Sequence, residues 1–279
     1  MSHLRVSSGN AATRNTIKEQ NESTDRNETE IIWVQKNRVG LTLRDAIEEL
    51  KHCCIVLHLS QKCDERLGIP VQHANTEKYT LIARHGSSDN LKAMVTLLDD
   101  NVIQAEVTIK YPKAAGGYYR AVAQPDVQWK LQQLQDLGNH IARATVGLCE
   151  MRVFLDALSN FSKESGSKIL SELKHIKNEI CQARLAIQLP RKRSLLELCY
   201  FPPTRKFVPP LPQDQLLSFY ISSCRLVCAS YQMVPKNVNP QGLSIHMAEC
   251  QLPHLDEILR RLNLAMNCMQ TLIGYMDML

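Results

Sequence analysis

Apolar residues recur at alternating spacings of three and four along several long segments of the 279-residue chain. This spacing places them on one face of an amphipathic helix. The predicted helices cover residues 41–64, 125–158, 167–188, 214–234 and the chain from residue 253 onward. We expect their apolar stripes to meet in one seam, which contains Leu131, Leu134, Ile141, Ile169, Leu173, Ile176, Ile180, Leu217, Leu262 and Met269.

The period of the pattern changes between residues 77 and 123. Four short apolar runs are separated there by turn-forming residues, which is typical of an antiparallel meander. Residues 243–248 are expected to add one more strand. Residues 190–212 contain six of the twelve prolines and are predicted to form a loop, because proline cannot continue a helix.

These elements predict an α+β protein. We expect an elongated antiparallel four-helix bundle in which the N- and C-terminal helices pair, together with a small antiparallel β domain. The bundle is assigned residues 30–70, 125–242 and 252–279, and the β domain residues 71–124 and 243–251. Residues 1–29 are polar and are predicted to be a disordered tail, because they offer little apolar surface to bury.

The composition fits a globular protein with helix packing. Hydrophobic residues make up 44% of the chain, aromatic residues only 5%, and the formal net charge is +5 with acidic and basic residues interleaved. The ten cysteines include no Cys-x-x-Cys pair, so we expect free thiols in a reducing compartment and no metal. No signal-peptide core and no apolar run of about 18 residues is present, which predicts a cytoplasmic protein without a transmembrane segment.

The sequence carries few catalytic signatures. It has no nucleotide-binding glycine motif, no G-x-S-x-G and no H-E-x-x-H. Ser165-Gly166-Ser167-Lys168 matches the S-x-x-K element of penicillin-recognising enzymes and Ser88-Asp89-Asn90 their S-D-N element, but the two stand in reversed order and K-T-G is missing. We therefore expect neither catalytic residues nor a cofactor, and keep a hydrolase only as an unfavoured alternative.

Basic and aromatic residues flank the proline-rich loop. The candidate partner-binding residues are Arg191, Lys192, Arg193, Tyr200, Phe201, Arg205 and Lys206. The simplest interpretation is an ordinary solvated loop. Docking of a protein partner is a second, because proline-rich segments lose little entropy on binding. Binding of an anionic membrane surface or of nucleic acid is a further alternative.

Three stretches of the chain resemble the Rogdi family. The polar run from Gln128 to Asp136, followed by Asn139 and His140, is similar to the start of the family's long central helix. Residues 207–221 resemble its proline-rich entry to a helix, and residues 248–255 its approach to the final helix. The resemblance covers residues 30–279, although the polar N-terminal segment is longer than is usual in the family.

The resemblance implies a non-enzymatic scaffold with a leucine-zipper-like helical bundle and a small β domain. It implies membership of a RAVE-like (rabconnectin-3) complex with a DmX-like/rabconnectin-3 alpha protein and a WD-repeat rabconnectin-3 beta protein. That complex promotes assembly of the proton pump V-ATPase, and family members are linked to neuronal function and synaptic vesicles. A cytoplasmic protein at endosomal or synaptic-vesicle membranes, with a nuclear pool, is the expectation that follows, and binding of nucleic acid is not expected.

Overall fold

The computed structural model describes residues 28–71, 75–83, 90–126, 128–200, 206–235 and 242–278. The predicted disordered tail therefore lies almost entirely outside the described residues. So do Phe201 and Arg205 of the predicted partner-binding loop.

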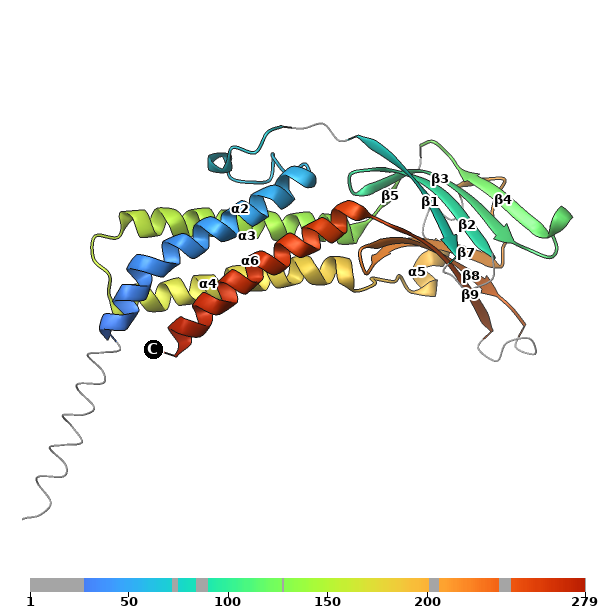
Figure 1. Ribbon diagram of the computed structural model, residues 1–279. Helices are drawn as coiled ribbons and strands as arrows, with labels where there is room; N and C mark the ends of the chain where they lie inside the picture. Colours follow the sequence, from blue (N-terminus) through green and yellow to red (C-terminus); the bar gives the residue numbers. More distant parts are fainter. Residues whose placement is uncertain are drawn as a thin grey trace, which may run out of the picture.

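Long helices fill one half of the molecule (Figure 1). Residues 28–34 are helical and continue through the π-helical turn η1 (Gln35–Val39) into the first long α-helix. The α-helices that the structure describes are α2 (Gly40–Val56), α3 (Gln132–Ala157), α4 (Lys163–Gln188), α5 (Leu195–Tyr200) and α6 (Pro253–Asp277). Helix α4 begins at a capping box between Ser162 and Ser165, and α6 begins at Pro253, whose missing N–H costs nothing in the first turn.

The long helices pack against one another in pairs: α3 on α4, α2 on α6, α4 on α6 and α2 on α3. Helices α2 and α6 come from opposite parts of the chain and lie side by side (Figure 1). Arg261 of α6 joins them, because its guanidinium donates to Glu49 of α2 at 2.9 Å and to Glu257 of its own helix at 2.7 Å.

The other half is a single curled antiparallel sheet (Figure 1). Its strands are β1 (Thr76–Ala83), β2 (Leu91–Leu98), β3 (Asn101–Lys110), β4 (Tyr118–Ala123), β5 (Trp129–Lys130), β6 (Phe207–Val208), β7 (Gln215–Ser222), β8 (Arg225–Met233) and β9 (Leu243–Gln251). Eight of them follow the order β6-β4-β3-β2-β1-β9-β8-β7, and β5 pairs with β3. Short helical turns η2 (Glu65–Leu67) and η3 (Ala115–Gly117) lie in the connections.

The predicted four-helix bundle with a small β domain is wrong. The β part is a nine-stranded, half-barrel-like sheet, and the helix expected over residues 214–234 is the hairpin β7–β8. Both faces of this hairpin are buried, so its apolar residues run nearly without interruption and lack the period of two that marks a half-exposed strand. Ser223 and Cys224 form its turn with positive φ values of 51° and 60°, a conformation that their residue types rarely indicate.

Two predicted helix boundaries are wrong as well. Helix α2 ends at Val56, because His58 takes a left-handed conformation with φ of 52° and turns the chain. Helix α3 begins at Gln132 rather than near residue 125, because Trp129 and Lys130 pair with β3. The Trp129 ring packs against Phe207 and Phe219, with centroids 5.5 Å apart in both pairs, so this residue closes the sheet instead of opening the helix.

One hydrophobic core runs through the helices and the inner face of the sheet. All ten residues of the predicted seam are buried in it. Their elements differ from the prediction at two positions: Leu217 lies on strand β7, and Leu131 immediately precedes α3. Gly147 of α3 allows close approach to α4, since a Cβ there would stand 3.0 Å from the Ile176 side chain.

Candidate functional site

The sheet has a second, outer face that the long helices do not cover. Side chains alternate between the faces, so Leu81, Ala93 and Val107 enter the core while their neighbours in sequence point outward. On strands β7 and β8 the outer face is covered by α5. Its Leu198 completes a small second core with Leu216, Tyr220, Val227, Ala229 and Tyr231.

The rest of the outer face, from β9 to β6, carries large apolar side chains in contact with solvent. We call these residues the exposed sheet patch: Ile82, Met94, Val122, Val208, Ile245 and Met247, each 37–56% exposed. Register places Val122 opposite Val208 and Ile82 opposite Glu249. Glu106 stands between Met94 and Val122, so the patch consists of separate apolar areas with charged side chains between them.

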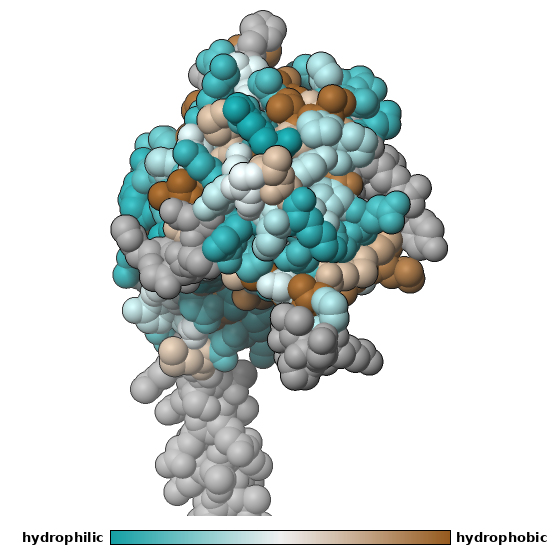
Figure 2. All heavy atoms as spheres, turned by 90° about the vertical axis from the view of Figure 1, so that its right-hand side faces the viewer, coloured by the Kyte–Doolittle hydropathy of each residue, from teal (hydrophilic) through white to brown (hydrophobic). Residues whose placement is uncertain are grey.

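The exposed sheet patch is hollowed at its β4–β6 end. A cavity of about 430 Å³ opens there between Val122, Val208, Ile103 and Pro125. Figure 2 looks at the sheet end of the molecule and shows separate apolar areas set among polar ones. The hollow therefore offers a pocket for an inserted apolar side chain, and the surrounding polar areas can contribute hydrogen bonds.

Charges on this face are partly paired with one another. Arg120 contacts Glu106 at 2.5 Å, and Arg225 contacts Glu249 at 3.0 Å. Lys92 is exposed beside Met94 on β2 and has no ion-pair partner among the described residues. The free charge next to the patch is therefore positive.

A second cavity, of about 360 Å³, lies where the helices meet the sheet, and we call it the junction cavity. His58 Nδ1 stands 3.0 Å from an Asp99 carboxylate oxygen, and both residues have positive φ. Burial lowers the pKa of His254, against the opposing effect of the Glu77 carboxylate. The described residues that line this cavity include no serine, threonine or cysteine that a histidine could activate as a nucleophile.

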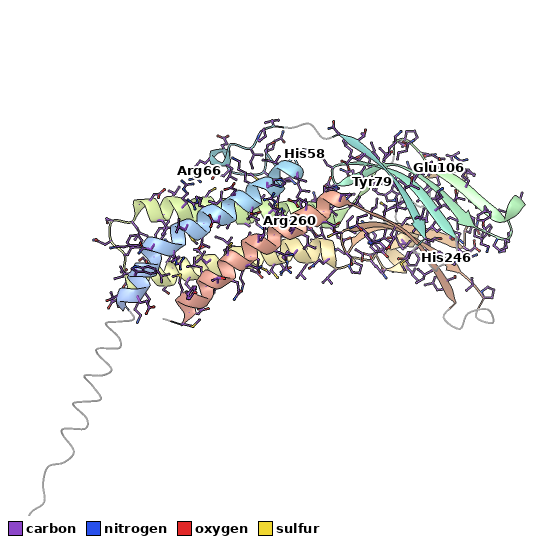
Figure 3. All side chains as sticks on the ribbon, in the orientation of Figure 1. His58, Arg66, Tyr79, Glu106, His246 and Arg260 are labelled. Atoms are coloured by element: carbon purple, nitrogen blue, oxygen red, sulfur yellow. The ribbon has the colours of Figure 1, made fainter. Side chains whose placement is uncertain are left out.

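One serine does lie within reach of a histidine. Ser244 Oγ is 3.2 Å from His246 Nε2, and the Asn90 amide nitrogen is 3.2 Å from His246 Nδ1. The three side chains form a hydrogen-bonded link between β9 and the residue that precedes β2. Figure 3 shows His246 on the sheet, far from His58 at the end of α2.

The predicted partner-binding loop is partly held against the body of the protein. Arg191 contacts Asp136 of α3 at 2.6 Å, Lys206 contacts Asp126 at 3.5 Å, and the Lys192 ammonium lies 6.0 Å from the centre of the Tyr220 ring. Arg193 precedes α5, and Tyr200 is its last residue. Lys206 directly precedes β6, and its carbonyl accepts from the N–H of Gln124, which lines the hollow of the exposed sheet patch. Partner binding by the loop stays a prediction.

Sequence reasoning did not find the exposed sheet patch. The strands of Ile82, Met94 and Val122 were expected, but their outward face is defined by pairing with β9 and β6, which local patterns do not reveal.

In the part of the chain that the structure describes, no cluster of three or more potential metal ligands occurs. No described helix has both the length and the apolar character needed to cross a membrane.

Comparison with known proteins assigns the family. The family model for Rogdi leucine zipper containing protein matches residues 30–249. Protein rogdi homolog of Caenorhabditis elegans is 67% identical over 254 residues, which cover 89% of this chain and 87% of that protein. Protein rogdi of Drosophila melanogaster is 29% identical over 201 residues, 71% of each chain. The human protein rogdi homolog is 26% identical over 258 residues, which cover 83% of this chain and 85% of that protein. The chain therefore belongs to the Rogdi family.

Proposed function

We propose that this protein is a non-enzymatic adaptor subunit of a RAVE-like (rabconnectin-3) complex, which promotes assembly of V-ATPase and acidification of organelles or synaptic vesicles. Its partners are a DmX-like/rabconnectin-3 alpha protein and a WD-repeat rabconnectin-3 beta protein. Membership of the Rogdi family supports this proposal. The geometry adds an exposed apolar surface on the sheet that is suited to protein binding.

The exposed sheet patch is the observation that carries the proposal. Where α5 covers the same outer face, apolar side chains close into a second core. The exposed sheet patch also carries apolar side chains, no described helix covers it, and a hollow at Val122 and Val208 is large enough for an apolar side chain. Lys92 adds a positive charge beside it. The partner surface that complements it is therefore apolar, with acidic residues at its edge.

The test is affinity purification of the tagged full chain from cells that contain the rabconnectin-like subunits. Met94→Glu and Val122→Glu each place a negative charge in the patch. We expect either change to reduce recovery of both subunits at least about tenfold and to slow organelle acidification, because a central apolar contact often contributes about 2 kcal/mol or more. Val153→Glu is the matched control, since Val153 is 49% exposed on α3, away from the sheet.

All three variants alter exposed side chains. Because Met94 and Val122 both stand opposite Glu106, the thermal midpoint of each variant is measured first, and recovery is compared at a temperature at which all variants are folded. Recovery of both subunits by Met94→Glu and Val122→Glu at the level of Val153→Glu would remove the patch as the binding surface. Absence of both subunits from the wild-type purification, with normal acidification after depletion of the protein, would refute the adaptor function itself.

A further inference from the structure

Two cysteines meet where α2 turns into the following loop. Cys54 lies in the last turn of α2 and is fully buried, whereas Cys63 lies on the loop and is partly exposed. The Leu59 N–H donates to the Cys54 carbonyl at 2.9 Å, which folds the loop back onto the helix. As a result the two sulfur atoms are 3.3 Å apart. They are in van der Waals contact, and a disulfide requires about 2.05 Å.

The surroundings give the two thiols different reactivity. The Cys54 thiol is the main cause of a lowered Cys63 pKa, about 7, because it donates a hydrogen bond to the Cys63 thiolate. The Thr145 hydroxyl of α3, 3.8 Å from Cys63 Sγ, and the Lys62 ammonium act in the same direction. The pKa of Cys54 is raised by that same hydrogen bond and by burial. Cys63 is thus the accessible nucleophile, with a neutral thiol in contact behind it.

We propose that Cys63 is an oxidation site for hydroperoxides and that Cys54 resolves it to a reversible disulfide. The Cys63 thiolate attacks the terminal oxygen of the hydroperoxide. The O–O bond breaks, Cys63 becomes a sulfenic acid, and the alkoxide or hydroxide leaves with a proton as alcohol or water. Cys54 sulfur then attacks Cys63 sulfur, the S–O bond breaks, and the hydroxyl leaves with the Cys54 proton as water. The two thiols are oxidised by two electrons, and the hydroperoxide is reduced.

The bond would change the junction between the helices and the sheet. The loop that it closes carries His58, which contacts Asp99 at the β2–β3 turn, and Lys62, which contacts Asn139 of α3. Both His58 and Lys62 line the junction cavity. A disulfide between Cys54 and Cys63 would tie the loop covalently to the last turn of α2 and so restrict the movement of the loop.

Trypsin separates the two cysteines, which gives a direct measurement. Cleavage after Lys51, Lys62 and Arg66 produces peptides 52–62 and 63–66. The full reduced chain is treated with hydrogen peroxide, free thiols are alkylated, and the digest is analysed by mass spectrometry. We expect the two peptides joined, lighter than their sum by two hydrogen atoms, and released by dithiothreitol.

Variants assign the bond, because peptide 52–62 also contains Cys53. Cys53→Ser should retain the joined peptides, and Cys54→Ser and Cys63→Ser should lose them. Cys54→Ser should instead accumulate a sulfenic acid on Cys63 that dimedone labels. Should oxidation of the wild type leave both thiols free, carry Cys63 to sulfinic acid unlinked, or join it to Cys149 of α3, the proposal is overturned. The wild-type digest decides this even if Cys54→Ser does not fold.

Discussion

Gln133 makes the contacts from which a large effect on stability is expected. It lies in the first turn of α3, is only 5% exposed, and its side-chain amide reaches two other elements. The amide nitrogen lies 2.7 Å from the Ile221 carbonyl of β7, and 2.8 and 3.0 Å from the Leu189 and Ala186 carbonyls at the end of α4. The amide oxygen accepts from the Ile221 N–H at 2.8 Å. One side chain thus joins α3, α4 and the sheet.

Replacing Gln133 by methionine keeps the size of the side chain and removes all of these hydrogen bonds. The Ile221 N–H is then buried without an acceptor, which costs about 1–3 kcal/mol. The amide has two hydrogens, and each lost bond to a carbonyl adds about 0.5–1.5 kcal/mol. The free energy of unfolding should therefore fall by about 2–6 kcal/mol. Gln133→Glu should be at least as harmful, because a carboxylate cannot donate to the carbonyls and must be buried.

The measurement is urea unfolding followed by circular dichroism, with the thermal midpoint as a second observable. Gln132→Met is the matched control: the neighbouring side chain is exposed and contacts only Gln135 and Asp136, so we expect a change within about 0.5 kcal/mol. If Gln133→Met unfolds at the same urea concentration as Gln132→Met, the amide does not hold the junction and the reasoning fails.

Two further changes test the core and its pH dependence. Ile176→Asp places a charge without a partner against Gly147 of α3 and should lower the free energy of unfolding by about 3–5 kcal/mol, whereas the exposed Glu172→Asp should leave the thermal midpoint unchanged. The pKa of His254 is lowered in the folded state by burial, so the unfolded chain binds more protons and stability is lost as the pH falls below about 6.5. His254→Gln should flatten the pH dependence of the unfolding free energy between about pH 7 and 5; an unchanged slope, equal to that of exposed His175→Gln, would contradict this.

Local patterns predicted the elements whose two faces differ. The stripe of Ile169, Leu173 and Ile176 indicates a helix, and α4 is found at Lys163–Gln188. The strand runs between residues 77 and 123 correspond to β1 to β4. The prediction of a helix over residues 214–234 was wrong because helix α5 and the main core bury the β7–β8 hairpin from both sides. Its apolar residues are therefore compatible with the spacing of three and four that indicates a helix and also with a strand buried on both faces. Only tertiary packing distinguishes the helix from the strand.

The exposed sheet patch could not be predicted from the sequence for a related reason. Met94 and Val122 belong to predicted strands, yet exposure depends on what covers the outer face, and α5 covers only its β7–β8 part. The cysteine contact was missed because Cys54 and Cys63 are nine residues apart. They meet only because the chain reverses at His58, a residue whose type does not predict a positive φ.

The polar run around Trp129, which resembles the Rogdi family, contains residues that make tertiary contacts. The apolar periodicity of the sequence does not indicate these contacts. Within this run, Trp129 closes the sheet against Phe207 and Phe219, and Gln133 binds the end of α4. The N–H groups of Ser223 and Cys224 in the β7–β8 turn bind the carbonyls of Gln188 and Ile187. Gln133 and this turn together satisfy carbonyl groups that a helix end otherwise leaves to water. Because these contacts fix the long helices to the inner face and edge of the sheet, the part of the outer face from β9 to β6 is not covered by any described helix.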